Sequence, residues 1–284
     1  MGETARLLIA SPDDTGLIAA VSGFIADHGG NIVDADQHTD IEAGKFFMRV
    51  EVEAAGFGLT AEEFGAAWSP VADRHSMRWR VRWTGTRSRV AILVGREGHC
   101  LADLLWRWRT GELDADIPLV ASNHPDLSGF VEPHGIPYHH LPVTPGKRDS
   151  QEAHLASLLD EARIDLVVLA RYMQVLGPEL VGRWQHRMIN IHHGFLPAFA
   201  GGRPYHQAHE RGVKLIGATG HYVTEDLDQG PIIAQATTTV RHHDTVEDMV
   251  RKGRDLERVV LAEAVRLHLE DRILVSGNRT VVFE

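Results

Sequence analysis

The stretch IDLVVLARYMQVLGPELVGRWQHRMINIHH, residues 164–193, has two short apolar runs with a helix-like segment between them. Residues 164–170 and 188–192 have the length of buried strands, and PELVGRW at 178–184 is typical of a helix. Further apolar runs and helical segments alternate from residue 89 onward. Because this order is typical of α/β proteins, we predict a doubly wound, mostly parallel sheet.

The second apolar run ends in polar residues. Side chains alternate along a strand, so Asn190 and His192 are expected to share one face at its carboxyl end. Gly194 and Pro197 then favour a turn away from the sheet. Ligands of such sheets bind at the carboxyl ends of strands, which makes this pair a candidate catalytic site. The alternative is that these polar groups only satisfy loop backbone.

A second polar region follows in KLIGATGHYVTEDLDQGPIIAQ, residues 214–235, which is typical of a strand, a turn and a returning strand. His221 and Val223 share one face of the first strand. The turn is rich in Asp, as turns generally are. A carboxylate can orient an imidazole by hydrogen bonding, so this turn, with Glu225, Asp226 and Asp228, offers candidate partners for His192.

The first part of the chain has a different pattern. Short strands alternate with two helical segments in the order βαββαβ, and FFMRVEVE and MRWRVRW alternate apolar with polar residues. Asp14 or Thr15 can cap the first helix, and Thr60 and Glu63 have the spacing of a capping box for the second. We predict a small ferredoxin-like sandwich with two helices on one face of the sheet.

The polar segment TGTRS, residues 84–88, is the predicted linker, which gives domains of residues 1–84 and 85–284. A net charge of −10 argues against non-specific nucleic-acid binding. The single cysteine, Cys100, excludes an internal disulfide and suits a reducing compartment. We find no apolar run long enough for a membrane helix and no signal peptide, so we expect a cytoplasmic protein.

The motifs SPDDTGL and HGGNIVDADQH in the βαββαβ segment resemble the ACT domain, a small module that senses amino acids. The resemblance implies an amino-acid effector near Asp14, Gly16 and Asn31. The alternative is that these residues only form turns, which Gly and Asp favour in any protein.

The motifs NIHHGFLPAF, GVKLIGATGHYV and EDLDQGPII together resemble the folate-dependent formyltransferase fold. An ACT domain before this fold resembles the formyltetrahydrofolate deformylases, and the likeness extends from Leu7 to Val282. The resemblance implies that Asn190, His192 and Asp228 are catalytic. It also implies eight substrate-binding positions, of which those in RYMQVL act largely through backbone groups: Met173, Gln174, Val175, Leu176, His221, Val223, Glu225 and Asp226.

The implied reaction is hydrolysis of 10-formyltetrahydrofolate to tetrahydrofolate and formate, which would supply formate for purine synthesis. No cofactor is implied, because the folate is the substrate and water the co-substrate; a homo-oligomer is implied. The loop GREGHCLADL lacks the Gly–Ser–Asn run of the glycinamide ribonucleotide transformylases, which supports water as the acceptor. Gly194 departs from the Ser that is usual in relatives. The alternatives are a formyltransferase with an amine acceptor and a non-catalytic amino-acid sensor.

Two other features were weighed as sites. The paired histidines at 139–140 and 242–243, with those near 190, suggest a metal only if a third ligand and an open position can be named, and the implied catalytic roles already account for Asn190 and His192. We therefore expect no metal ion. Cys100 begins a predicted helix after a strand, but a lone cysteine more often serves in packing.

Overall fold

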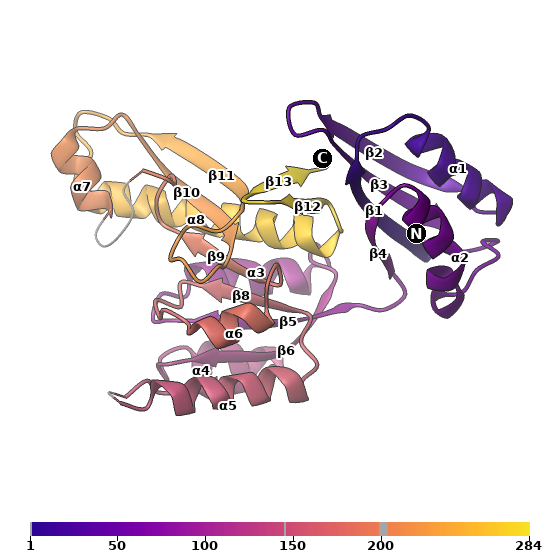
Figure 1. Ribbon diagram of the computed structural model, residues 1–284. Coiled ribbons are helices and arrows are strands. Elements are labelled where there is room, and N and C mark those ends of the chain that lie inside the picture. Colours follow the sequence, from indigo (N-terminus) through magenta and orange to yellow (C-terminus); the bar gives the residue numbers. More distant parts are fainter. Residues whose placement is uncertain (1, 145, 199–203) are drawn as a thin grey trace. The chain divides into compact units, whose positions relative to one another are not determined.

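The computed structural model describes residues 2–144, 146–198 and 204–284, which fold into two compact units (Figure 1). The first unit comprises the chain up to Arg87 together with Glu270–Ser276 and Val281–Glu284. The second comprises Ser88–Leu269 and Gly277–Thr280. The linker proposed from the sequence lies where the chain passes from the first unit to the second, and the C-terminal segment returns to the first.

The first unit has the predicted βαββαβ order. Its elements are β1 (Thr4–Pro12), α1 (Leu17–Asp27), β2 (Ile32–Asp40), β3 (Lys45–Glu53), α2 (Ala61–Arg74) and β4 (Arg78–Trp83). The four strands form an antiparallel sheet in the order β2-β3-β1-β4. One sheet face and the two helices enclose an aromatic core that includes Phe24, Phe64 and the fully buried Trp68. The alternation of apolar side chains in β3 and β4 therefore predicted the buried face.

The starts of the two helices differ in how well the sequence predicted them. The capping box of Thr60 and Glu63 is confirmed, since each side chain bonds the backbone N–H of the other. The cap predicted for α1 is wrong, because Gly16 holds the N-cap position and no side chain bonds there. Asp14 instead accepts a hydrogen bond from the N–H of Thr15, before the helix begins.

The other face of this sheet carries a network of ion pairs. Arg49, only 1% exposed, donates to Asp34 and Glu51 and to the backbone carbonyl of Asp271. Phe283 near the C-terminus is buried against β1 and β3 in the same unit. The last residues of the chain therefore complete the first unit.

The second unit contains a seven-stranded sheet in the order β11-β10-β9-β8-β5-β6-β7. Its elements are β5 (Ser88–Val94), α3 (His99–Arg109), β6 (Ala115–Ser122), α4 (Ser128–Val131), the 3₁₀ helix η1 (Glu132–His134), β7 (Tyr138–His140), α5 (Arg148–Glu161), β8 (Leu166–Ala170), α6 (Pro178–Arg183), β9 (Met188–His192), α7 (Pro204–Arg211), β10 (Leu215–Tyr222), β11 (Ile232–Thr239) and α8 (Val246–Leu269). Strands β5 to β9 pair in parallel, and β10 and β11 pair antiparallel. The prediction of a mostly parallel α/β sheet is confirmed. The final strands, β12 (Ile273–Ser276) and β13 (Arg279–Val282), form a separate two-stranded sheet.

Helices cover both faces of the large sheet. Helices α5 and α6 pack over one face through Leu155, Leu159 and Leu180, in a core that also contains Met188 of β9. Helices α3 and α8 pack together, and α8 also contacts β9, β10 and β11. Because side chains alternate along β9, Asn190 and His192 lie on the same face as Met188. None of the described helices is both long and apolar enough to span a bilayer.

Glu51 generates a pH-dependent prediction for the first unit. Burial raises the pKa of Glu51, but hydrogen bonds from Thr4, Arg49 and Arg6 lower it more, to about 2. Because the pKa is lower in the folded state, the carboxylate contributes stability above its unfolded pKa and loses it as the pH falls toward 2. We therefore expect Glu51→Gln to lower the free energy of unfolding most above about pH 5.

Urea unfolding of wild type and Glu51→Gln at several pH values measures this effect. The difference between the two proteins should shrink as the pH falls from about 4.5 toward 2, where wild-type Glu51 becomes protonated. Glu42→Gln, in an exposed turn, is the matched control. A difference that stays constant over this pH range would contradict the prediction.

Candidate active site

The carboxyl end of β9 holds the predicted pair of polar residues. Asn190 is half-buried and His192 is buried. Strand β10 runs beside β9 so that His221 lies opposite Asn190 and Thr219 opposite His192. Asn190 Nδ2 approaches His221 Nε2 at 3.3 Å, and His221 Nδ1 donates to the carbonyl of Tyr222 at 2.9 Å. Because a carbonyl can only accept, the His221 ring carries a proton on Nδ1.

Asp228 reaches this pair from the loop between β10 and β11. Its backbone has φ 56°, in the left-handed region, where Asp is tolerated better than most side chains. Oδ2 lies 3.1 Å from His192 Nδ1, and Oδ1 lies 3.7 Å from His221 Nε2. The structure thus connects Asn190, His221, Asp228 and His192 in one chain of contacts.

The environment of Asp228 favours its ionised form. Burial raises the pKa of Asp228, but the hydrogen bond from His192 helps to hold it well below its usual range. Since the carboxylate accepts from Nδ1, a neutral His192 ring presents its lone pair at Nε2. Nε2 is buried and has no hydrogen-bond partner among the residues that the structure describes. The site therefore offers one unused imidazole nitrogen beside a fixed carboxylate.

The turn after β9 is held by Thr219, which is fully buried. Its hydroxyl donates to the carbonyl of Gly194 at 2.8 Å and accepts from the N–H of Leu196 at 3.1 Å and from Gln235 at 3.0 Å. A Cβ at Gly194 would lie 3.0 Å from His192 Nε2, so a side chain there would require a small shift of the ring. A side chain at residue 194 would therefore act directly on the position of His192.

The positions expected to bind substrate have different surroundings. Met173 and Val175 are largely exposed, whereas Leu176 is buried in the core beneath α5 and α6. The carbonyl of Val175 accepts from Arg148 at 2.6 Å. In the loop after β10, the N–H of Val223 bonds the carbonyl of Met188. Gln174 is half-buried, and Glu225 and Asp226 are exposed. Their roles stay predictions.

The three residues expected to bind an effector lie at the surface of the first unit. Asp14 and Gly16 precede α1, and the backbone of Gly16 has φ 85°. Asn31 lies before β2 and donates to Glu53 at 3.2 Å. A role in effector binding stays a prediction.

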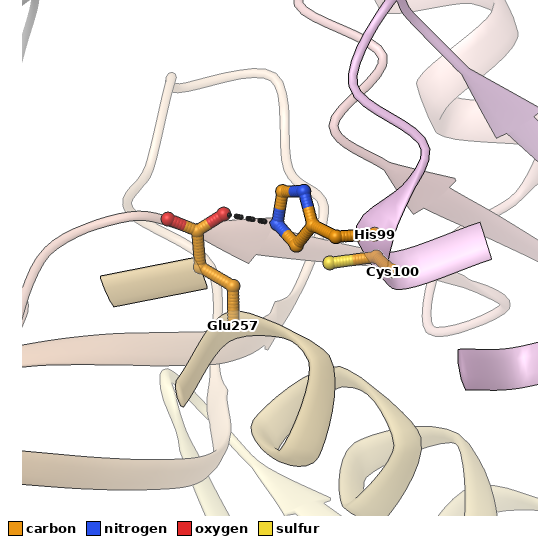
Figure 2. Close-up of side chains that lie close together, drawn as sticks. All are labelled: His99, Cys100 and Glu257. Atoms are coloured by element: carbon orange, nitrogen blue, oxygen red, sulfur yellow. Dashed lines mark hydrogen bonds and ion pairs between the residues drawn. The ribbon is translucent and has the colours of Figure 1, made fainter. Parts of the chain in front are cut away.

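Glu257 of α8 forms a second buried cluster that the sequence did not reveal (Figure 2). It is 1% exposed, accepts from His99 Nε2 at 2.8 Å and from the Tyr205 hydroxyl at 2.8 Å, and pairs with Arg171 Nε at 3.3 Å. An acidic residue four positions after the buried Gly253 of an amphipathic helix was the signal that could have identified it.

Ligand atoms of His99, Cys100 and Glu257 all lie within 4.8 Å of one another, as Figure 2 shows. Three observations argue against a cation there. The charge of Glu257 is already balanced by Arg171, and His99 Nε2 is bonded to the carboxylate. Burial and then the nearby Glu257 raise the pKa of the Cys100 thiol, which disfavours the thiolate that a metal needs. We interpret the cluster as a hydrogen-bonded ion network.

Comparison with known proteins places this geometry in a family. The formyl transferase family model matches residues 88–265, and the ACT domain model matches residues 5–68. A formyltetrahydrofolate deformylase of Synechocystis sp. is 52% identical over 99% of this chain and 98% of its own length. The chain belongs to the formyltetrahydrofolate deformylase family. A Bacillus subtilis deformylase of this family is 47% identical over 99% of the chain and 94% of its own length.

Solved structures agree with the assignment to the deformylase family. A formyltetrahydrofolate deformylase from Pseudomonas syringae superposes with a TM-score of 0.98 at 51% identity, covering 100% of this chain and 95% of that one. A glycinamide ribonucleotide transformylase from Symbiobacterium toebii superposes with a TM-score of 0.67 at 34% identity, over 71% of this chain and 97% of that one. The similarity to the deformylase structure therefore extends over the whole chain, including the ACT domain, whereas the similarity to the transformylase structure covers only part of it.

Thr219 provides a test of how the site is held. In Thr219→Val the shape is kept, but the Gly194 carbonyl and the Leu196 N–H lose their shared partner. An unsatisfied buried polar group costs about 1–3 kcal/mol, so we expect the free energy of unfolding to fall by that order. Urea unfolding measures the loss. Thr219→Ser keeps the hydroxyl and should stay close to wild type; equal stability of Thr219→Val and wild type would refute the role.

Proposed function

We propose that this chain hydrolyses 10-formyltetrahydrofolate to tetrahydrofolate and formate. The observation that carries the proposal is the chain of contacts from Asn190 through His221 and Asp228 to His192, in a member of the deformylase family. These groups supply what hydrolysis of a formamide requires: a donor for the developing oxyanion, and a base that can return its proton to the leaving nitrogen.

Asn190 is the proposed donor to the formyl oxygen. One N–H of its amide points to His221 at 3.3 Å, which fixes the amide plane and leaves the second N–H for the substrate. As water attacks the formyl carbon, negative charge collects on that oxygen. Donors placed in advance at such an oxygen are each worth about 10²–10³ in turnover.

His192 is the proposed carrier of the proton. In the first step, water adds to the formyl carbon and its proton passes to Nε2, which has no partner among the described residues. In the second step, the C–N10 bond breaks and Nε2–H returns the proton to N10. The products are tetrahydrofolate and formic acid, which ionises to formate. Protons and electrons balance without a cofactor or a metal ion, and we propose none.

Asp228 has the supporting role in this scheme. Its hydrogen bond with Nδ1 sets the His192 tautomer and stabilises the imidazolium that forms after the first proton transfer. Because its pKa lies well below the usual range, Asp228 is a weak base, which favours His192 as the group that takes the proton from water.

Exposed apolar side chains on the loops after β8 and β10, the two strands beside β9, support a flat aromatic ligand such as the pterin ring. Met173 and Val175 follow β8, and Leu227 precedes Asp228; all three are more than half exposed. Large exposed apolar groups gathered beside polar site residues are typical of ligand-binding regions. Binding by residues 173–176 and by Val223, Glu225 and Asp226 is part of the proposal.

The cellular setting is also proposed. The one cysteine, buried at Cys100, suits a cytoplasmic enzyme, and formate released there would serve purine synthesis. The ACT domain supports control by an amino-acid effector near Asp14, Gly16 and Asn31. A homo-oligomer is expected from the family resemblance.

Asp228→Asn tests the reaction directly. The change removes the charge that stabilises the His192 imidazolium, so we expect kcat to fall by about 10²–10⁴ at pH 7.5 with little change in folding. The measurement is formate release from 10-formyltetrahydrofolate with no amine present.

Asp160→Asn, in a surface ion pair, is the matched control and should keep wild-type activity. Near-normal turnover of Asp228→Asn would exclude the carboxylate role. Dependence of wild-type turnover on an added amine would favour a formyltransferase instead, and folate binding without turnover would favour a non-catalytic sensor.

A further inference from the structure

His193 lies against the catalytic histidine but belongs to none of the steps above. Its ring is nearly parallel to that of His192, with 5.2 Å between centroids and 19° between planes. The Tyr205 ring of α7 lies 6.1 Å away. The charge state of His193 therefore acts at short range on His192 and on any imidazolium formed there.

Arg171 determines that charge state by its geometry. Nη1 of its guanidinium is hydrogen-bonded to Nδ1 of His193. A guanidinium can only donate, so Nδ1 must accept and the His193 proton must lie on Nε2. A protonated His193 would place N–H against N–H and cation against cation. The contact is thus compatible only with a neutral His193 ring.

Glu257 in turn fixes Arg171. The carboxylate is 1% exposed and lies 3.3 Å from Arg171 Nε, and His99 and Tyr205 also donate hydrogen bonds to it. The carbonyl of Arg171 also accepts from the N–H of Gly95 at 3.1 Å, and a Cβ at Gly95 would lie 2.5 Å from that oxygen. Residue 95 is therefore required to be small, and Arg171 is held at both backbone and side chain.

We propose that Arg171, fixed by Glu257, is a positioning residue that keeps His193 uncharged and in place against His192. This inference rests on the proposed hydrolysis, in which His192 becomes an imidazolium between the two proton transfers. A second imidazolium stacked on His192 would oppose that intermediate state by charge repulsion. The same cation would also compete with His192 for the carboxylate of Asp228.

The other titratable groups around His193 do not cancel the effect of Arg171 on its charge. Arg171 follows β8, Glu257 lies on α8, His192 precedes it on β9 and Asp228 lies on the loop after β10. The carboxylates of Glu257 and Asp228 favour the charged form of His193, whereas Arg171 and His192 oppose it. Burial and then Arg171 lower the pKa of His193 to about 4, consistent with the hydrogen-bond geometry.

The test combines a histidine titration with kinetics in the full-length protein. Imidazole ¹⁵N shifts of wild type should show His193 uncharged above about pH 5. In Arg171→Gln the midpoint should rise by about one pH unit or more, because the opposing cation is gone. With a midpoint near pH 5, about half of His193 would be charged at pH 5, so the ratio of kcat at pH 8 to kcat at pH 5 should then increase about twofold over wild type, with little change in KM.

Three variants complete the design. The double variant Arg171→Gln/His193→Phe has no ring to protonate at 193, so its kcat ratio should return to the wild-type value. Arg183→Gln, in a surface pair with Asp160, is the matched arginine control. Arg171→Asn replaces Arg171→Gln if the latter does not fold, since the backbone of residue 171 has φ 63° and Asn tolerates that region.

Each result decides the inference. A wild-type His193 midpoint near 6.5 would overturn it without any variant, as would an unchanged midpoint and kcat ratio on removal of Arg171. A low-pH loss that persists in the double variant would show that Arg171 acts only on the fold. If wild type releases no formate, the proposed function fails, and the wild-type His193 midpoint still reports whether Arg171 keeps the ring uncharged.

Discussion

The hydrogen bond between His192 Nδ1 and Asp228 is the contact on which the site depends. It joins the end of a parallel strand to a loop 36 positions further along the chain, and it leaves Nε2 as the imidazole nitrogen without a hydrogen-bond partner among the described residues. The antiparallel pairing of β9 with β10 makes the contact possible, because it sets His221 beside Asn190 and returns the following loop to His192. The sheet therefore positions the two residues, and this one bond orients the imidazole that we propose as the proton acceptor.

The parts predicted from sequence are those with local or periodic causes. Alternation along residues 188–192 predicted that Asn190 and His192 share a face, and the Thr60–Glu63 spacing predicted a capping box. Asp228 required family resemblance, because nothing in an Asp-rich turn distinguishes one carboxylate from its neighbours. The cap of α1 was mispredicted because Asp14 bonds within its own turn, an alternative that Asp side chains readily adopt.

The pairing of Glu257 with Arg171 could not be predicted from sequence patterns. Glu and Arg usually lie at the protein surface. Here Glu257 is buried against His99 of α3 and Tyr205 of α7, and it pairs with Arg171 after β8. A buried charge is tolerated only when such partners surround it, and a single sequence does not identify partners that distant. His193 contacts both His192 and Arg171, so it connects the His192–Asp228 pair with the Glu257–Arg171 pair. Helix α8 therefore contributes Glu257 to these contacts in addition to covering one face of the sheet.

The discontinuous first unit has a consequence for biosynthesis. Its sheet is formed by residues up to Trp83. The backbone carbonyls that accept hydrogen bonds from the buried Arg49 come from the C-terminal segment, and so does the aromatic ring of Phe283. A ribosome releases that segment only after the entire α/β sheet has emerged. Co-translational folding proceeds from the N-terminus in most multidomain chains. Here the first unit stays incomplete until residues 270–284 have emerged, so a part made early is finished only after the second unit has been made.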